Sequence, residues 1–335
     1  MLRFENKFIF MKIRTFLLLL GIGILTIQCQ KNYNDYAEFE AEPPYILNMN
    51  EEQRPYFEAY DKALKLWGAN YEELYVPTSF GMAHVIVSGP QKGEPTVLLH
   101  GMNASATSWY PNAKDLSKDH RVFAIDLLIE PGKSDMSREV EDIDAIVAWY
   151  FEIFEKLQLE KFNIIGASRG GWLSVAIGLH DQTKIEKMVL LSPAQTLKWI
   201  QPSSGLLANI IYALSPEKKR LESVLESMSA NVKKIDQKYI NQYFLGSQLD
   251  SINRFVVDMK PFSNDELNTL KMPVLVLIGD DDLINNEKSL EVAKENIPNI
   301  VAEIIPNAGH FLSIDQAEMV NSKILDFLDS DPKQK

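Results

Sequence analysis

Six continuous apolar runs alternate with helix-like segments along most of the chain. Runs of this composition are typical of strands buried on both faces of a sheet, and the segments between them have helical spacing. This alternation predicts an α/β fold, in which a mostly parallel, doubly wound sheet carries helices on both faces. The expected strands are 96–101, 121–128, 162–168, 187–194, 273–280 and 302–309, and the clearest helical patterns are 139–158, 171–180 and 315–328.

Two regions depart from this rhythm. The β-like runs 71–78 and 82–89 are joined by three residues and predict a hairpin. The interval between the fourth and fifth buried runs is far longer than an ordinary strand–helix connection and is rich in aromatic and aliphatic residues. We expect 195–266 to form a helical cap over the carboxyl ends of the strands, with a surface insertion as the alternative. Residues 56–194 and 267–335 then form the core.

The N-terminus has the layout of a secretory signal. Lys12 and Arg14 precede the apolar stretch 16–27, which is shorter than the roughly 20 residues that a membrane-spanning helix needs. The only cysteine, Cys29, stands where cleavage would fall, and its surroundings resemble the lipid-attachment site of bacterial lipoproteins. We therefore expect 1–28 to be a signal peptide and Cys29 to carry a lipid that anchors the protein in the bacterial cell envelope.

The alternative for this region is an uncleaved N-terminal membrane anchor. Met11 is a second candidate for the first residue, because a complete charged region follows it. Residues 29–55 are polar and acidic and include Pro43 and Pro44, a composition that suits a tether more than a folded element. Contact with the membrane is expected through the lipid anchor.

Charge and composition exclude other classes of function. The chain of 335 residues has a formal net charge of −12 and no cluster of Lys and Arg, which argues against nucleic acid as a partner. One cysteine and five scattered histidines do not form a metal-binding pattern, so no metal is expected. The hydrophobic fraction of 46% is sufficient for a large globular core.

The third buried run ends in Gly-Ala-Ser-Arg-Gly, residues 166–170. Gly166, Ser168 and Gly170 fit the pattern G-x-S-x-G, in which a nucleophilic serine stands on a strained turn between a strand and a helix. A serine hydroxyl is a poor nucleophile until a base takes its proton, and that base needs an acid to orient it. The motif therefore predicts Ser168 as a nucleophile whose two partners lie elsewhere in the chain.

The acid and the base follow such a serine in a fixed order, with the histidine last. His310 follows the last buried run and is the expected base, whereas His180 ends the helix that starts at Ser168, about 15 Å away at 1.5 Å per residue. The acid is expected among the aspartates that follow the fifth run. Asp282 is preferred because it lies beyond the strand end, and Asp280 is the alternative.

Backbone amides near the serine complete the expected site. The amide of Arg169, at the start of the helix, is one candidate donor to an oxyanion, because the helix dipole also favours negative charge there. The amide of Met102, in the loop after the first buried run, is the other candidate. His100 is in the same loop but precedes Ser168 in the chain, so we expect it to brace the loop.

With these residues placed, the chain resembles the α/β-hydrolase family over about residues 70–330. The segments TVLLHGMNASATSWYPN, AIDLLIEPGKS, GASRGG and NAGHFLSIDQ are similar to those of the bacterial carboxylesterase NP group, whose members cleave esters of arylpropionic acids. The resemblance implies an α/β-hydrolase fold and esterase activity. Two features depart from the group: Arg169 replaces an uncharged residue, and the N-terminus is lipoprotein-like.

The sequence therefore favours a serine hydrolase that cleaves carboxylic esters of small, apolar substrates through an acyl-enzyme. Its expected partner is a small-molecule ester, and no cofactor is expected. Lactonase, amidase, carbon–carbon bond hydrolase and acyltransferase activities use the same three side chains and remain open. A lipid-anchored binding protein that keeps the pocket without turnover is a further alternative. Arg169 either reshapes the pocket floor or forms a buried ion pair, and we expect the ion pair.

Overall fold

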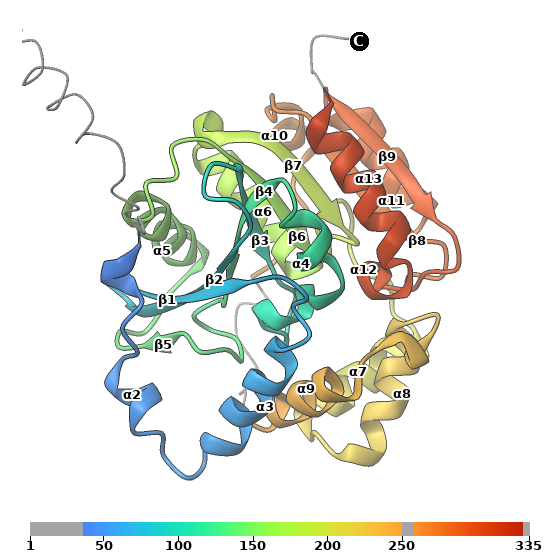
Figure 1. Ribbon diagram of the computed structural model, residues 1–335. Helices are drawn as coiled ribbons and strands as arrows, with labels where there is room; N and C mark the ends of the chain where they lie inside the picture. Colours follow the sequence, from blue (N-terminus) through green and yellow to red (C-terminus); the bar gives the residue numbers. More distant parts are fainter. Residues whose placement is uncertain (1–35, 250–257, 331–335) are drawn as a thin grey trace, which may run out of the picture. The chain divides into compact units, whose positions relative to one another are not determined.

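Nine strands form one sheet in the computed structural model, which describes residues 36–249 and 258–330 (Figure 1). The strands are β1 Tyr71–Thr78, β2 Gly81–Ser88, β3 Glu94–Leu99, β4 His120–Ile125, β5 Asp135–Met136, β6 Phe162–Ala167, β7 Ile185–Leu191, β8 Val274–Gly279 and β9 Ile300–Ile305. Their order is β1-β2-β4-β3-β6-β7-β8-β9, with β5 paired to β2. Neighbours from β4 to β9 are parallel, whereas β2 is antiparallel to β1, β4 and β5. The predicted hairpin and mostly parallel sheet are confirmed.

Helices cover both faces of this sheet. The α-helices are α2 Pro44–Leu47, α3 Arg54–Leu64, α4 Tyr110–Leu116, α5 Ile143–Lys156, α6 Arg169–His180, α7 Ser204–Leu214, α8 Lys218–Met228, α9 Gln237–Leu249, α10 Asn264–Asn268, α11 Glu287–Asn296, α12 Leu312–Asp315 and α13 Ala317–Asp329, with short 3-10 helices at Ala37–Phe39, Ala106–Trp109, Gln182–Lys184 and Val232–Lys234. Helices α4 and α13 pack together on one face, and α5 and α6 pack on the other (Figure 1). Every residue of β4 and β8 is buried between the two layers, which accounts for their continuous apolar sequences.

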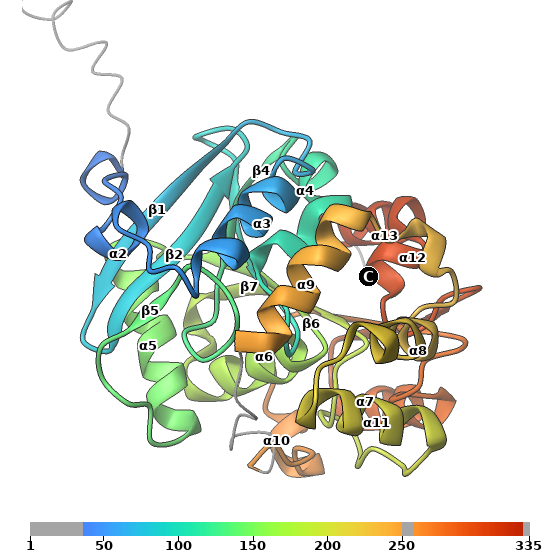
Figure 2. The same cartoon turned by 90° about the horizontal axis from the view of Figure 1, so that it is seen from below.

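The segment between β7 and β8 contains α7, α8, α9 and α10 (Figure 2). Its helices contact the loops that follow the last two strands. A Cβ atom at Gly205 in α7 would lie 2.9 Å from the side chain of Leu283, and the amide of Phe311 donates to the carbonyl of Met228 at the end of α8. These contacts place α7 and α8 beside the loops that carry Asp282 and His310.

The structure corrects the expected extent of the tether. Residues 29–55 were expected to be unfolded, but a compact unit begins at Phe39, and α2 buries Ile46 in the main core together with Tyr56 of α3. The physical reason is that Pro44 stands at the first position of α2, where its fixed φ angle favours a helix and no amide is needed. The predicted signal peptide 1–28 and Cys29 lie outside the described residues.

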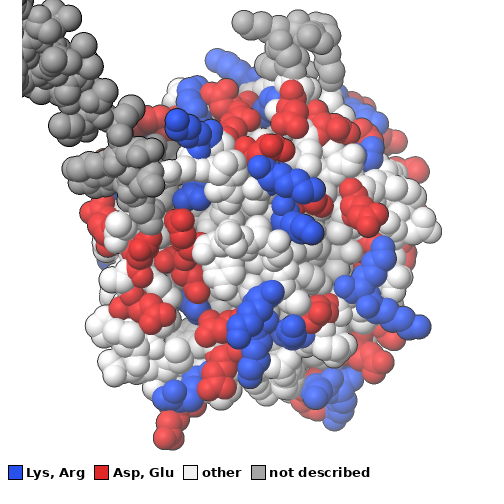
Figure 3. Space-filling view, in the orientation of Figure 1, with Lys and Arg blue, Asp and Glu red and all other residues white. Residues whose placement is uncertain are grey.

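Two properties of the described residues bear on possible partners. Within the described ranges, the structure has no helix with the length and apolar content needed to cross a bilayer. On the face shown in Figure 3, basic and acidic side chains are interspersed. That face therefore has no continuous basic surface of the kind that nucleic acid binds.

A cluster of buried charges joins α3, β1 and β2 to the loop after β4. His84 lies between two carboxylates, with Nδ1 2.8 Å from Asp126 Oδ2 and Nε2 3.0 Å from Glu73 Oε2. Lys133 Nζ is 2.6 Å from the same Glu73 oxygen, and the Tyr60 hydroxyl donates to Asp126 Oδ2 at 2.9 Å. Burial opposes the charge of Glu73, but hydrogen bonds and charges from His84 and Lys133 outweigh it and lower its pKa to about 2. The cluster therefore holds the hairpin to the core through charged groups.

This cluster predicts acid-sensitive stability. The folded pKa of Glu73 lies below its ordinary value of 4.5, so its ionised form stabilises the fold above about pH 4.5, and this contribution is lost as the pH falls towards 2. At pH 6, Glu73→Gln should lower the free energy of unfolding by about 1–3 kcal/mol, as measured in urea, and the deficit should shrink at pH 3. Glu303→Gln, which removes a partly exposed ion pair with Lys323, is the control and should change stability by less than about 1 kcal/mol. A deficit that is equal at both pH values would contradict the assignment.

Candidate active site

Ser168 stands on a sharp turn between β6 and α6. Its backbone angles, φ 53° and ψ −116°, are rare for a residue with a side chain. The turn brings backbone segments into contact, because a Cβ atom at Gly166 would lie 2.2 Å from the carbonyl oxygen of Gly170. A Cβ atom at Gly170 would lie 2.0 Å from the carbonyl oxygen of Leu99 in β3. Glycine is therefore required at both positions, which explains the G-x-S-x-G pattern in physical terms.

His310 and Asp282 approach Ser168 from the loops that follow β9 and β8. His310 Nε2 lies 2.9 Å from Ser168 Oγ, and His310 Nδ1 lies 2.9 Å from Asp282 Oδ1. The side chains of His310 and Asp282 are 1% and 0% exposed. The structure thus brings the three predicted side chains into one chain of hydrogen bonds. In this geometry the imidazole can take a proton from Ser168 Oγ while the carboxylate stabilises the resulting positive charge.

The surroundings of Asp282 favour its ionised form. Its oxygens accept the Ile284 amide at 2.9 Å and the Asn285 side-chain amide at 3.2 Å, in addition to the bond with His310. Burial opposes ionisation, but the charge and hydrogen bond of His310 outweigh burial, so the pKa of Asp282 lies below its ordinary value. Asp282 therefore remains a carboxylate at neutral pH.

Asp280, the alternative acid, has a different position. It is exposed, and its two oxygens accept the amides of Asn307 and Ala308, each at 3.0 Å. These hydrogen bonds lower the pKa of Asp280 and fix the turn that precedes His310. The carboxylate of Asp280 is directed at this turn, whereas that of Asp282 contacts the imidazole.

The loop 100–107, which we call the oxyanion loop, passes directly beside the nucleophile. A Cβ atom at Gly101 would lie 3.2 Å from Ser168 Cβ and 3.8 Å from Ser168 Oγ, and Met102 is the next residue of this loop. Arg169 is the first residue of α6, and the first amides of a helix have no acceptor within the helix. The amides of Met102 and Arg169 therefore lie on the two segments that border Ser168 Oγ.

His100 braces the oxyanion loop, as expected. Its Nε2 atom accepts the Leu127 amide at 2.9 Å, which places the ring proton on Nδ1, and Nδ1 then donates to the Gly101 carbonyl at 2.8 Å. Burial lowers the pKa of His100, so the ring is neutral at pH 7. His180, the other excluded histidine, lies at the far end of α6.

The segment 126–133, which we call the brace loop, supports the oxyanion loop at two further points. Asp126 Oδ1 accepts the Ala106 amide at 2.7 Å, and Glu130 Oε2 accepts the Asn103 amide at 2.7 Å. Glu130 Oε1 also contacts Arg169 Nη1, so the expected buried ion pair of Arg169 is present. Glu130 is not among the site residues that the sequence predicts. In the sequence, Glu130 is marked only as the carboxylate that ends the apolar stretch before Pro131 and Gly132.

Asp315 is a second residue that the sequence analysis missed. Its carboxylate is buried and accepts the Gly309 amide at 2.9 Å, the Ala230 amide at 2.9 Å and the Ser229 hydroxyl at 2.5 Å. Gly309 precedes His310, whereas Ala230 and Ser229 follow α8. Asp315 therefore fixes the histidine loop to the segment between β7 and β8. An aspartate in an amphipathic helical pattern gives no sign of this role.

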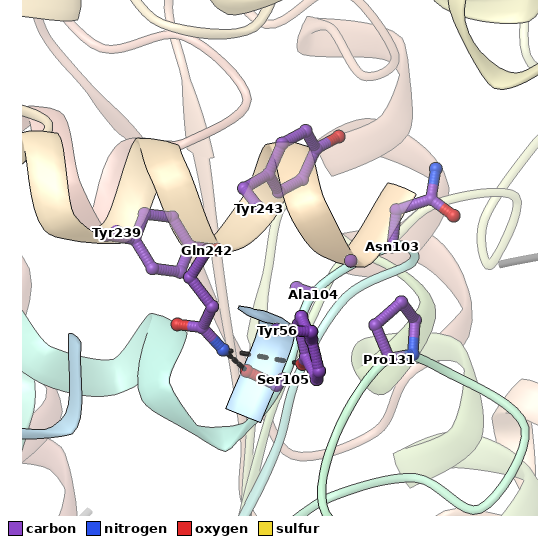
Figure 4. A pocket seen from close by; sticks show the side chains of 9 residues that line it. Tyr56, Asn103, Ala104, Ser105, Pro131, Tyr239, Gln242 and Tyr243 are labelled. Carbon is purple, nitrogen blue, oxygen red and sulfur yellow. Dashed lines mark hydrogen bonds between the residues drawn. The ribbon is translucent and has the colours of Figure 1, made fainter. Parts of the chain in front are cut away.

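A small pocket lies between α9, α3 and the two loops (Figure 4). Gln242 of α9 crosses to the oxyanion loop, where its Nε2 atom donates to Ser105 Oγ at 2.8 Å and its Oε1 atom accepts the Thr107 hydroxyl at 2.7 Å. The lining residues are Tyr56, Asn103, Ala104, Ser105, Pro131, Tyr239, Gln242, Tyr243 and Gly246. Three tyrosines, Tyr56, Tyr239 and Tyr243, thus line the pocket together with polar and small residues, and the pocket adjoins the residue that follows Met102. Within residues 36–249 and 258–330, no group of His, Cys, Asp or Glu is arranged to hold a metal ion.

The family model described as serine aminopeptidase, S33 (Hydrolase_4) matches residues 93–317, more than half of the chain. The chain belongs to this family of α/β hydrolases. Two Bacillus subtilis (strain 168) relatives of this hydrolase, "Uncharacterized carboxylesterase nap" and "Carboxylesterase YbfK", are each 30% identical to it over 82% of its chain and 93% of their own. The crystal structure of naproxen esterase (carboxylesterase NP) from Bacillus subtilis gives a TM-score of 0.79 at 28% identity, covering 84% of this hydrolase and 99% of that chain. The predicted fold class and the resemblance to the carboxylesterase NP group are confirmed.

Asp282 contacts the His310 ring, whereas its neighbour Asp281 is exposed. Substitutions at these two positions should therefore change the reactivity of this hydrolase to different extents. Asp282→Asn replaces the carboxylate that holds the His310 ring, so reaction of Ser168 with a fluorophosphonate probe should slow by about 10⁴-fold. Asp281→Asn, a matched change at the exposed neighbouring position, should leave the labelling rate within about twofold. The measurement is the rate of probe incorporation followed by mass spectrometry. Equal rates of probe incorporation in the two variants would show that Asp282 does not activate Ser168.

Proposed function

We propose that this hydrolase cleaves carboxylic esters of small, apolar substrates through an acyl-enzyme, with Ser168, His310 and Asp282 as its catalytic residues. The observation that carries the proposal is the chain of hydrogen bonds from Ser168 Oγ through the His310 ring to Asp282, with 2.9 Å at each step. The carboxylesterases nap and YbfK, which match over most of this chain, support the same reaction class. This protein is a serine hydrolase of the esterase type.

The first half of the reaction forms the acyl-enzyme. Ser168 Oγ attacks the ester carbonyl carbon as His310 Nε2 takes the hydroxyl proton, and the buried Asp282 stabilises the imidazolium. The negative charge that develops on the carbonyl oxygen is accepted by the amides of Met102 and Arg169. The bond to the alcohol oxygen then breaks, and His310 returns the proton to the departing alcohol.

The second half releases the acid. A water molecule gives its proton to His310 Nε2 and attacks the acyl carbon, and the same two amides accept the oxyanion again. The bond from the acyl carbon to Ser168 Oγ then breaks, and His310 returns the proton to Oγ. Both halves use groups that this chain supplies, and each half ends with His310 neutral.

The aromatic side chains beside the oxyanion loop support an apolar substrate. Tyr56, Tyr239 and Tyr243 present aromatic surface beside the oxyanion loop, and burial raises the pKa of Tyr239 well above its ordinary range, so its hydroxyl stays neutral. A neutral aromatic lining binds apolar acyl or alcohol groups more favourably than charged ones. One solved relative is named naproxen esterase, and naproxen is an aromatic acid. This name agrees with an apolar substrate class.

The decisive test of the proposed function is the removal of the nucleophile. Ser168→Ala should lower kcat/KM for p-nitrophenyl butyrate by at least about 10⁴-fold, because it removes the hydroxyl that His310 Nε2 contacts. The substitution removes one oxygen and opens no core cavity, so the midpoint of thermal unfolding should change little. A matched control is Ser174→Ala, between one and two turns further along α6, which should remain active. A Ser168→Ala variant that retains a tenth of the wild-type rate would contradict the proposal.

We further propose that the protein is held at a membrane of the bacterial cell envelope by a lipid on Cys29. The apolar stretch and the single cysteine of the N-terminus support this, and so does an exposed apolar face of α7. Leu207, Ile210, Ile211 and Leu214 are 42–64% exposed and share one face of this helix. The segment 195–249 has seven basic and four acidic residues, although the whole chain has a net charge of −12. An exposed apolar helix face in a segment with more basic than acidic residues suits an anionic bilayer surface.

The anchor is tested by metabolic labelling. Expressed in a bacterial host, the wild type should incorporate labelled palmitate and sediment with membranes, since two or more acyl chains hold a protein stably at a bilayer. Cys29→Ser should carry no label, and a chain that starts at Asn32 should be soluble and still hydrolyse ester. Absence of label from the wild type, with residues 1–28 still attached by mass spectrometry, would replace the lipid anchor with an uncleaved membrane anchor.

A further inference from the structure

Arg169 and Glu130 form a buried ion pair that the catalytic steps above do not use. Their side chains are 3% and 0% exposed, and Arg169 Nη1 contacts Glu130 Oε1. Taking two charges out of water is unfavourable, and apolar residues of similar volume often stabilise a core at least as well. The stability of the fold therefore does not by itself explain why a charged pair stands directly after the nucleophile.

Glu130 connects this pair to the oxyanion loop. Its second oxygen, Oε2, accepts the amide of Asn103 at 2.7 Å. Hydrogen bonds from an amide to a carboxylate are shorter and stronger than bonds between neutral groups. Asn103 has a φ angle of 55°, a left-handed conformation that asparagine adopts more readily than most residues with a side chain, and the bond to Glu130 adds to what holds it there. The bond fixes the peptide unit between Met102 and Asn103, and so restricts rotation at Met102.

Arg169 connects the same carboxylate to the other side of the nucleophile. Its own amide is the second proposed donor to the oxyanion, while its guanidinium holds Glu130. One carboxylate therefore links the segment that carries the Met102 amide to the residue that carries the second amide. We propose that the Arg169–Glu130 pair is a positioning device that sets the two oxyanion donors relative to each other. This inference rests on the proposed function, and both side chains act through the loop as positioning residues.

The charge of Glu130 is the essential part of this device. Without a cation beside it, a fully buried carboxylic acid would favour its protonated form, which is a weaker acceptor for the Asn103 amide. The Arg169 guanidinium places the opposite charge directly against Glu130 Oε1, and an uncharged residue at position 169 would not. The charged residue at position 169 and the carboxylate of the brace loop thus form one functional unit.

The decisive variant is Arg169→Met/Glu130→Gln, which removes both charges and leaves neither unpaired. Its kcat for p-nitrophenyl butyrate should fall by about 10–100-fold while KM stays within about threefold, because oxyanion donors act mainly in the transition state. The pH midpoint of kcat/KM should not change, since the contacts among Ser168, His310 and Asp282 are intact. Amide hydrogen exchange of the peptide that covers 100–107 should become about tenfold faster or more.

Lys323→Met/Glu303→Gln is the matched control. It removes a partly exposed Lys–Glu ion pair, with Lys323 Nζ 2.5 Å from Glu303 Oε2, that joins α13 to β9. We expect kcat, KM and the exchange of 100–107 to remain at wild-type values. Arg169→Lys provides a second variant that keeps the charge but loses the planar fork, and it should give faster exchange of 100–107 and an intermediate kcat.

Two outcomes would overturn the inference. In the first, the double variant has wild-type kcat and wild-type exchange of 100–107, which would make the pair a neutralised core contact only. In the second, KM rises and kcat is unchanged, which would make Arg169 a substrate-binding group. If the double variant does not fold, unchanged exchange and kcat in Arg169→Lys overturn it instead. Failure of this inference can be distinguished from failure of the proposed function. If the wild type did not hydrolyse esters, the amide exchange of 100–107 could still be compared between the wild type and the double variant.

Discussion

The close approach of three backbone segments at Ser168 determines the rest of the site. The positions of Gly166 and Gly170 leave no room for a Cβ atom, so β6, the start of α6 and the end of β3 meet at contact distance. This packing aims the serine out of the turn and places the oxyanion loop, which continues from β3, beside it. Because neighbouring strands from β4 to β9 are parallel, the loops that carry Asp282 and His310 emerge at the same edge of the sheet.

The sequence predicted those parts of the molecule that follow from local patterns. Buried strands covered by helices on both faces need continuous apolar runs, and the expected run 121–128 therefore coincides with β4 to within a few residues. The order of serine, acid and histidine similarly led to the three side chains that the structure brings together. Local patterns also misled: Pro43 and Pro44 indicated a tether, whereas Pro44 begins α2 and the neighbouring Ile46 joins the core.

The supporting residues were not predictable, because their roles depend on loops that meet only in three dimensions. Glu130 accepts the Asn103 amide, Asp315 accepts the Gly309 amide, and Asp280 accepts the amides of the turn before His310. In each case a carboxylate takes up backbone amides that a strand or helix would otherwise satisfy. A lone Asp or Glu in the sequence has no feature that distinguishes this role from that of a solvated surface residue.

Because carboxylates hold these loops in place, the rigidity of the loops and the ionisation of the catalytic acid depend on pH in the same way. Burial opposes the charge of both Asp126 and Asp282, but bonds and charges from His84 and His310, respectively, lower both pKa values, and amides of the turn lower that of Asp280. A lowered pKa in the folded state means that each ionised group stabilises the native structure above its ordinary pKa and loses this effect as the pH falls. A fall in pH therefore weakens three parts of the site together. These are the brace for the oxyanion loop, the turn before His310 and the acid that orients His310. Near neutral pH all three carboxylates are charged, and the loops and the hydrogen-bonded chain at Ser168 are stabilised together.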